Sequence, residues 1–382
     1  MLHFSEAEYE RRRHALLERM RERKLDGMFL FAQESMYWLT GYDTFGYCFF
    51  QCLVVTAKGD TALLTRSADL RQAQLTSNIA DVRVWRDRAN ANPSHNLRTL
   101  AEEMELLGTR IGVEYDTHGL TAAAGRALDR EMKTFASLED ASDIVSELRV
   151  VKSDAEIACI RRAGELTDDA FEAALPLIGD GADEAAILSA MQGTILAGDG
   201  DYPANEFIIG SGPQALLCRY YSGRRRLSAP DQITLEWAGA YRHYHVAAMR
   251  TVPVGEPRPD HREKFDAALA ALQAVEGAMQ PGHTFGDVFD AHAAALDDHG
   301  LSRARLAACG YSLGARFSPS WMEKQMFVTG STRAVEPNMS LFAHMIVMDS
   351  QTGTAMTVGR TYLTTDADPE PLSRLPLDFV TR

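Results

Sequence analysis

The sequence predicts two domains of different class: a smaller α/β domain over residues 1–150 and a larger α+β domain over residues 151–382. A chain of 382 residues is too long for one ordinary hydrophobic core. In the first 150 residues, short apolar runs alternate with helical patterns, which is typical of an α/β domain. After residue 151, long helices are interleaved with candidates for a mostly antiparallel sheet, which indicates an α+β domain.

The first domain begins with a predicted helix that Ser5 and Glu8 open as a capping box, because serine and glutamate can satisfy each other's backbone amides. A short apolar run at 28–31 predicts a buried strand. The turn AKGD predicts a hairpin between strands at 51–56 and 61–66. The remaining elements are strands at 82–85 and 110–114 and helices near 94–107 and 118–132.

The second domain begins with a long helix over 153–175, which a second capping box of Ser153 and Glu156 opens. Apolar residues recur along it at helical spacing and indicate a core face. We place the domain boundary just before this helix. Further helices are predicted near 182–197, 260–279 and 284–299, and strands near 205–209, 232–238, 247–254, 340–348 and 355–364.

Composition excludes several classes of function. A formal net charge of −14 argues against a nucleic-acid binder, whose surface would be basic. The five cysteines are scattered and contain no Cys-x-x-Cys pair, which indicates neither a disulfide framework nor a cysteine zinc site. No secretion signal is evident, and no apolar stretch approaches the length of a membrane helix. We therefore expect a cytoplasmic protein that binds neither nucleic acid nor membrane.

Five stretches of the second domain occur in an order that carries a family resemblance. They are 149–170 (RVVKSDAEIACIRRAGELTDDA), 234–251 (TLEWAGAYRHYHVAAMRT), 281–292 (PGHTFGDVFDAH), 310–314 (GYSLG) and 335–345 (VEPNMSLFAHM). Together they resemble the pita-bread hydrolases, the family of prolidase, methionine aminopeptidase and creatinase. Residues 37–47 (YWLTGYDTFGY) resemble the extra N-terminal domain of creatinase and prolidase. The resemblance implies an α+β pita-bread domain after a smaller α/β creatinase/prolidase-type domain.

The resemblance also shows where the metal ligands of the family are missing. Metal-dependent members hold two divalent ions with two aspartates, one histidine and two glutamates. The matching positions in this chain are Glu236, Ala247, Tyr311, His344 and either Gly359 or Arg360. Alanine and glycine offer no metal ligand, and tyrosine is a poor one at neutral pH, so we predict no metal.

Creatinase is similar to this chain in lacking the metals, but two of its substrate-handling residues also differ. Arg219 stands where creatinase has a histidine, and Phe49 stands where it has an arginine that grips the substrate carboxylate. Creatine itself is therefore not the expected substrate.

The predicted catalytic residues are Glu236, His245, His344 and Tyr311. Residues two apart on a strand share a face, so the histidines of the YRHYH segment should point into the same chamber as position 247. A buried glutamate beside a histidine is a reasonable general acid/base pair. Each group also has a structural interpretation: Glu236 in an ion pair with Arg250 or Arg219, the histidines in the core, and Tyr311 as a capping aromatic. The predicted substrate-binding residues are Arg219, Tyr220, His243, Arg250, Tyr47 and Phe49.

Our leading prediction is a metal-independent, creatinase-like hydrolase without a cofactor. It would cleave a C–N bond in an amidine, guanidino, cyclic-amidine or amide substrate, a small polar compound derived from an amino acid. Ectoine hydrolase belongs to the same wider group. The alternatives are an Xaa-Pro aminopeptidase or dipeptidase and a non-catalytic pita-bread binding protein. In creatinase-like dimers the loop equivalent to residues 42–50 reaches the partner's chamber, so the resemblance implies a homodimer with the N-terminal domain of one subunit near the site of the other.

Overall fold

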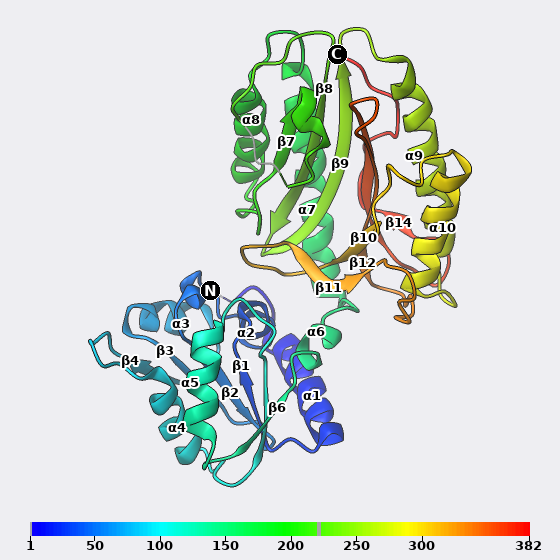
Figure 1. The fold of residues 1–382 in the computed structure, drawn as a ribbon. Coiled ribbons are helices and arrows are strands. Elements are labelled where there is room, and N and C mark those ends of the chain that lie inside the picture. Colours follow the sequence, from blue (N-terminus) through cyan, green and yellow to red (C-terminus); the bar gives the residue numbers. More distant parts are fainter. Residues whose placement is uncertain (1, 220–222) are drawn as a thin grey trace. The chain divides into compact units, whose positions relative to one another are not determined.

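The computed structural model describes residues 2–219 and 223–382. The chain divides into two compact units, Met1–Arg149 and Val150–Arg382, each built on its own β-sheet (Figure 1). Within the described ranges, no helix combines the length and the apolar character needed to cross a membrane.

The first unit is a mixed sheet with helices packed against it. Its strands are β1 (Gly27–Leu30), β2 (Cys52–Thr56), β3 (Thr61–Arg66), β4 (Asp81–Trp85), β5 (Arg110–Val113) and β6 (Ser137–Asp140). They lie in the order β4-β3-β2-β1-β5-β6, and the hairpin β2–β3 is antiparallel as predicted. Its helices are α1 (Glu6–Arg23), α2 (Gln33–Thr40), α3 (Leu70–Thr76), α4 (Pro93–Glu103), α5 (Ala122–Met132) and α6 (Ile144–Leu148). The predictions did not include α2, α3, α6 and β6, which are short elements of four to eight residues.

The second unit is an antiparallel sheet with its long helices packed against one face. Its strands are β7 (Ile208–Ser211), β8 (Asp231–Tyr241), β9 (Tyr244–Val254), β10 (Gly310–Leu313), β11 (Met322–Met326), β12 (Ser340–Asp349), β13 (Thr354–Leu363) and β14 (Glu370–Pro371). They run in the order β11-β10-β12-β13-β9-β8-β7, and β14 pairs with β13. The helices are α7 (Asp154–Ala174), α8 (Glu184–Ala197), α9 (Pro259–Ala278) and α10 (Phe285–Asp298).

Helix α7 lies directly against β8 and β9. Its predicted capping box is confirmed, because Ser153 and Glu156 satisfy each other's backbone amides. On the sheet side, the Trp237 indole N–H donates to the carbonyl of Thr167 at 2.8 Å. A side chain at Gly239 would meet the carbonyl oxygen of Ala163 at 2.2 Å, so a glycine is needed where helix and strand approach each other. This contact covers the odd-numbered face of β8 and leaves the even-numbered face for the site.

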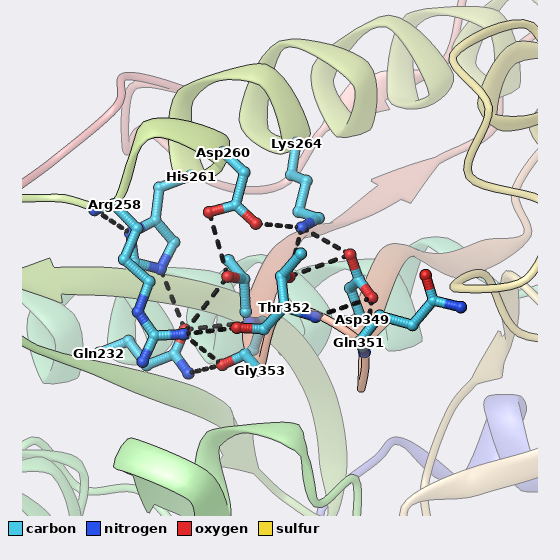
Figure 2. A network of polar contacts seen from close by, with 11 residues as sticks. Gln232, Arg258, Asp260, His261, Lys264, Asp349, Gln351, Thr352 and Gly353 are labelled. Carbon is cyan, nitrogen blue, oxygen red and sulfur yellow. Dashed lines mark hydrogen bonds and ion pairs between the residues drawn. The ribbon is translucent and has the colours of Figure 1, made fainter.

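A partly buried polar network fixes the start of α9 to the turn between β12 and β13 (Figure 2). The ammonium of Lys264 forms ion pairs with Asp260 and with Asp349, the latter at 2.9 Å. His261 and Gln232 hydrogen-bond at 3.0 Å, and the Gln232 amide donates to the carbonyl of Gly353 at 2.8 Å. The network therefore joins α9, β8 and the β12–β13 turn, and it holds the helix layer in register with the sheet.

Candidate active site

The strand register places one row of residues across the open face of the second sheet. Cross-strand partners on antiparallel strands point to the same face. Ile208 pairs with Glu236, Glu236 with Met249, Met249 with Gly359, and Gly359 with His344. Glu236 and His344 therefore lie at the same level of the sheet, on the face opposite α7.

Glu236 is the buried acid of this row, with only 6% of its surface exposed. Its Oε1 accepts the hydroxyl hydrogen bond of Tyr311 at 3.4 Å, and the Tyr311 oxygen accepts the indole N–H of Trp321 at 2.8 Å. Burial raises the pKa of Glu236 to about 7, against the lowering effects of the Arg219 charge and the Tyr311 hydrogen bond. Near neutral pH this carboxyl is therefore poised between its acid and base forms, as a proton-transfer group should be.

Tyr311, which contacts Glu236, and His344, which lies beside Tyr311, both stay neutral. Burial, together with the nearby Glu236 charge, raises the pKa of the Tyr311 phenol well above its ordinary value. The ring of His344 lies 5.6 Å from that of Tyr311 and 5.3 Å from that of Phe342, measured between centroids. Burial lowers the pKa of His344 to about 3, and its Nδ1 has no hydrogen-bond partner among the described residues. His344 is therefore a neutral imidazole with a free polar atom at this site.

A cleft of about 270 Å³ adjoins this cluster. Arg219 lies in its lining, and its charge acts on both Glu236 and Tyr311. Asn205, another lining residue, accepts the backbone N–H of Trp321 at 3.2 Å and so ties the cleft wall to the hydrogen-bonded chain behind it. Such a volume suits a small molecule, because drug-sized ligands need about 300–1,000 Å³. The lining is Asn205, Glu206, Ile208, Arg219, Pro319, Ser320 and Met322.

The residues of this chamber do not fit the pair of divalent ions that the resemblance implies. Ala247 offers no ligand, and both its backbone N–H and its carbonyl bond to the hydroxyl of Thr361. A Cβ at Gly359 would lie 2.9 Å from Met249 and 2.9 Å from Phe342, so those side chains occupy the space of a ligand. Across residues 2–219 and 223–382 no group of three or more His, Cys, Asp and Glu residues could hold a metal ion.

The register also decides between the two positions considered for the last metal ligand. Gly359 pairs with Met249 and His344 and lies on the site face. Arg360 is the next residue along β13, so its side chain points to the helix face. The glycine, and not the arginine, is the residue that faces the chamber.

The predicted pairing of Glu236 with the two histidines of the YRHYH segment is wrong. His243 lies in the two-residue turn between β8 and β9, with φ of 65°, and its ring stacks on Phe317 at 4.1 Å. His245 is on the site face, but its partner Ala240 is four residues from Glu236, roughly 13 Å at the usual strand rise. Burial lowers the pKa of His245 to about 3.

His245 instead holds the segment that leads into the cleft. Its Nε2 accepts the backbone N–H of Ala204 at 2.9 Å, immediately before Asn205 in the cleft lining. Its ring lies 6.4 Å from the ring of Trp321. The structure therefore gives His245 a positioning role toward the site rather than contact with Glu236.

Arg250 is not a neighbour of Glu236, which corrects the prediction that both act on one substrate. It pairs with Leu235 on β8, so its side chain points to the helix face of the sheet. Its guanidinium donates to the carbonyls of Met249 and Gly359 at 2.8 and 2.6 Å. The predicted ion pair of Glu236 with Arg250 is excluded by the same geometry.

The other predicted substrate-binding residues lie elsewhere. Tyr47 and Phe49 belong to the first unit, where Phe49 is exposed and the Arg66 guanidinium lies 4.0 Å from its ring centre. Their role at a subunit interface stays a prediction. Tyr220 falls outside the described residues.

Trp321, Met249 and Phe342 are site residues that sequence reasoning missed. Trp321 supplies the hydrogen bond that orients Tyr311, while Met249 and Phe342 fill the chamber beside Gly359. Met249 could have been predicted, because side chains alternate between the two faces of a strand and Met249 is two residues from Ala247. Trp321 lies seven residues after the GYSLG segment, and no local sequence pattern indicates its hydrogen bond to Tyr311.

Sequence comparison identifies related proteins over nearly the whole chain. The family model described as metallopeptidase family M24 matches residues 158–366, and that of the creatinase/prolidase N-terminal domain matches residues 12–151. Ectoine hydrolase of Halomonas elongata is 28% identical over 361 residues, which cover 89% of each chain. An uncharacterized hydrolase/peptidase of Sinorhizobium fredii is 26% identical over 394 residues, which cover 100% of this chain and 99% of that protein.

Comparison with solved structures gives the same fold. The Xaa-Pro dipeptidase from Bacillus anthracis superposes with a TM-score of 0.84 at 18% identity, over 98% of this chain and 100% of that one. At this identity the likeness shows the fold alone. The predicted fold class, a pita-bread domain after a creatinase/prolidase-type domain, is confirmed.

Proposed function

The chain belongs to metallopeptidase family M24, and from that premise we propose that it is a metal-independent hydrolase of C–N bonds. The substrate is a small polar compound derived from an amino acid, with an amide, amidine, guanidino or cyclic-amidine group. The relative named ectoine hydrolase supports a small-molecule substrate over a protein or nucleic acid. The missing metal ligands at Ala247 and Gly359 support chemistry that uses protein groups alone.

The observation that carries the proposal is Glu236, a buried carboxyl with a pKa raised to about 7 beside a small cleft. As a carboxylate it takes a proton from a water molecule, whose oxygen forms a bond to the trigonal carbon of the substrate. As an acid it then gives that proton to the departing nitrogen when the C–N bond breaks. One group thus serves both steps because its pKa lies near the operating pH.

Arg219 and Tyr311 complete the proposed site. The Arg219 guanidinium, in the cleft lining, suits a substrate carboxylate because its planar donors match the two oxygens. The Tyr311 phenol keeps its proton, since burial raises its pKa. Its hydroxyl donates a hydrogen bond to Glu236, while its oxygen accepts one from the Trp321 indole N–H. The hydrogen bond that it donates fixes the orientation of the Glu236 carboxyl.

The test is a substrate screen on the purified full chain, with and without a chelator. The panel contains small amides, amidines, guanidino acids, cyclic amidines and Xaa-Pro dipeptides. We expect turnover of a small C–N substrate that survives the chelator, with kcat/KM rising with pH through about 7 because the base form is required. Glu236→Gln should lose at least about a hundredfold in kcat, while the exposed control Glu165→Gln keeps the wild-type rate.

Three results would contradict the proposal. Turnover that appears only with added manganese, cobalt or zinc would return the protein to metal-dependent chemistry. Turnover restricted to Xaa-Pro dipeptides would make it a peptidase. Failure to turn over any member of the panel, with specific binding retained, would favour the non-catalytic binding protein.

A further inference from the structure

A second cavity lies on the helix face of the same sheet, opposite Glu236. Its volume is about 220 Å³, and its walls are largely apolar. Val252 contributes from β9 and Phe265 from α9, while the C-terminal segment covers another side. The apolar lining is Phe171, Leu175, Val252, Phe265, Leu375 and Val380.

Arg250 is the buried cation of this cavity, with 7% of its surface exposed. One guanidinium nitrogen, Nη1, donates to two backbone carbonyls. No carboxylate within the described residues lies at ion-pair distance from it. Burial, and then the neighbouring charge of Arg360, lowers its pKa to about 10, which still leaves it charged at neutral pH. A buried charge in this situation is costly unless an anion compensates it.

Arg360 adds to the positive charge of this region. It lies two residues from Val358, the β13 partner of Arg250, and therefore on the same face. Its Nη2 donates to the carbonyl of Leu375, while its Nε has no hydrogen-bond partner in the described chain. The negative charge of Asp168 acts on Arg250 from a distance. Its carboxylate already accepts hydrogen bonds from the Ser373 hydroxyl at 2.5 Å and from the Arg374 backbone N–H at 2.7 Å.

We propose that this cavity binds a small organic monocarboxylate with an apolar body, at a site separate from the Glu236 cleft. The carboxylate compensates Arg250 through the planar donor geometry of the guanidinium, and the apolar body fills the volume between α7, α9 and the C-terminal segment. A volume below that of drug-sized pockets limits the ligand to a small acid.

The acidic residues of the lining favour a single negative charge on the ligand. Glu172 lines the cavity but is half exposed and pairs with Arg374 at 2.9 Å. Asp378 lines it from the C-terminal segment and is exposed to solvent. Both carboxylates repel a second negative charge at the rim, so dicarboxylates and phosphate should bind more weakly than monocarboxylates.

The test uses isothermal titration calorimetry on the full chain with isocaproate and benzoate as probes. Their neutral amides serve as isosteric controls, because they keep the apolar body and lose the charge. We expect saturable binding of at least one acid, with its amide at least tenfold weaker. Equal affinity for acid and amide, or the absence of saturable binding by both acids, would overturn the proposal.

Four variants locate the binding. Arg250→Met should lose at least tenfold in affinity for the acid. Leu175→Phe should lose affinity by filling the cavity without touching the guanidinium, and it remains decisive where Arg250→Met does not fold. Leu177→Phe is its matched control in the same turn, at a position 43% exposed to solvent. Loss of binding in Arg219→Ala, with retention in Leu175→Phe, would place the acid in the Glu236 cleft and refute a second site.

Discussion

Replacing Glu236 with glutamine is expected to stabilise the second unit at alkaline pH while it removes the proposed catalysis. The pKa of this carboxyl is raised from 4.5 to about 7, chiefly by burial. Since each pH unit corresponds to about 1.4 kcal/mol, ionisation costs roughly 3 kcal/mol more in the folded than in the unfolded chain. Glutamine is nearly isosteric, carries no charge, and its carbonyl oxygen can still accept the Tyr311 hydrogen bond.

The sign of the effect follows from proton binding. Well below pH 4.5 the carboxyl is protonated in both states, so the wild type carries no penalty relative to the variant. Between pH 4.5 and about 7 the unfolded chain releases its proton while the folded chain keeps it, so the free energy of unfolding of the wild type falls as pH rises. The stability difference between variant and wild type should therefore grow by about 2 kcal/mol from pH 5 to pH 8.

Urea unfolding at both pH values measures this difference. Tryptophan fluorescence follows both units, because Trp38 and Trp85 lie in the first unit and Trp237 and Trp321 in the second. The effect of Glu236→Gln is therefore the difference between the variant and the wild type in the same two-unit signal. The exposed variant Glu165→Gln should change stability by less than about 0.5 kcal/mol at either pH. A Glu236→Gln variant that is no more stable than the wild type at pH 8 would show that Glu236 ionises without the burial cost, and it would refute the reasoning.

The remaining predictions concern the groups around Glu236 and the network beneath α9. Tyr311→Phe removes a hydrogen bond that lowers the Glu236 pKa, so the acid limb of the pH–rate profile should move to higher pH; an unchanged midpoint would contradict this contact. Trp321→Phe should cost about 1–3 kcal/mol in urea unfolding and lower kcat, because the buried Tyr311 hydroxyl loses its donor. Lys264→Met should cost about 2–3 kcal/mol, because it leaves two facing aspartates without their cation. Arg262→Met on the same helix removes an exposed ion pair and the guanidinium contacts with Phe265 and Phe379, and it should cost under about 1 kcal/mol. If both variants lost the same free energy of unfolding, burial would not explain the strength of the Lys264 ion pairs.

The long elements of the fold were predictable because their sequence periods are strong. The helix over 153–175 and the long strands β8, β9, β12 and β13 follow from apolar spacing and capping residues, and the structure places them within a few residues of the predicted bounds. The short elements α2, α3, α6 and β6 were missed, as were β10, β11 and β14 of the second sheet. Short strands such as β1 (GMFL) were predicted from an apolar run, which β6 (SLED) and β11 (MEKQM) lack.

The wrong predictions at the site have two causes. One is an unrecognised turn at Arg242 and His243, and the other is the alternation of side chains along β9. Arg242 and His243 both adopt positive φ, at 50° and 65°, although neither is the glycine or asparagine that usually marks such a turn. The YRHYH segment therefore resembled one continuous strand. Arg250 lies three residues from Ala247, so strand alternation separates them, and only the family resemblance suggested that they share a site. Glu236, Tyr311 and His344 were placed by that resemblance, while their hydrogen bonds and the contribution of Trp321 required tertiary structure.

Returning carboxylates to positions 247 and 359 should not return a metal site, because Met249 and Phe342 fill the space beside Gly359. Ala247→Asp with Gly359→Glu supplies two carboxylates beside Glu236. A Cβ at position 359, however, meets Met249 Cβ and the Phe342 ring at 2.9 Å, and a Cβ so close to its own backbone cannot swing away. We expect the double variant to lose stability and to hold less than one manganese ion per chain by elemental analysis after dialysis, with Ala247→Asp alone as the control. Two ions per folded chain would contradict this. They would show that only the ligands are missing and that Met249 and Phe342 can move aside to make room for a side chain at position 359.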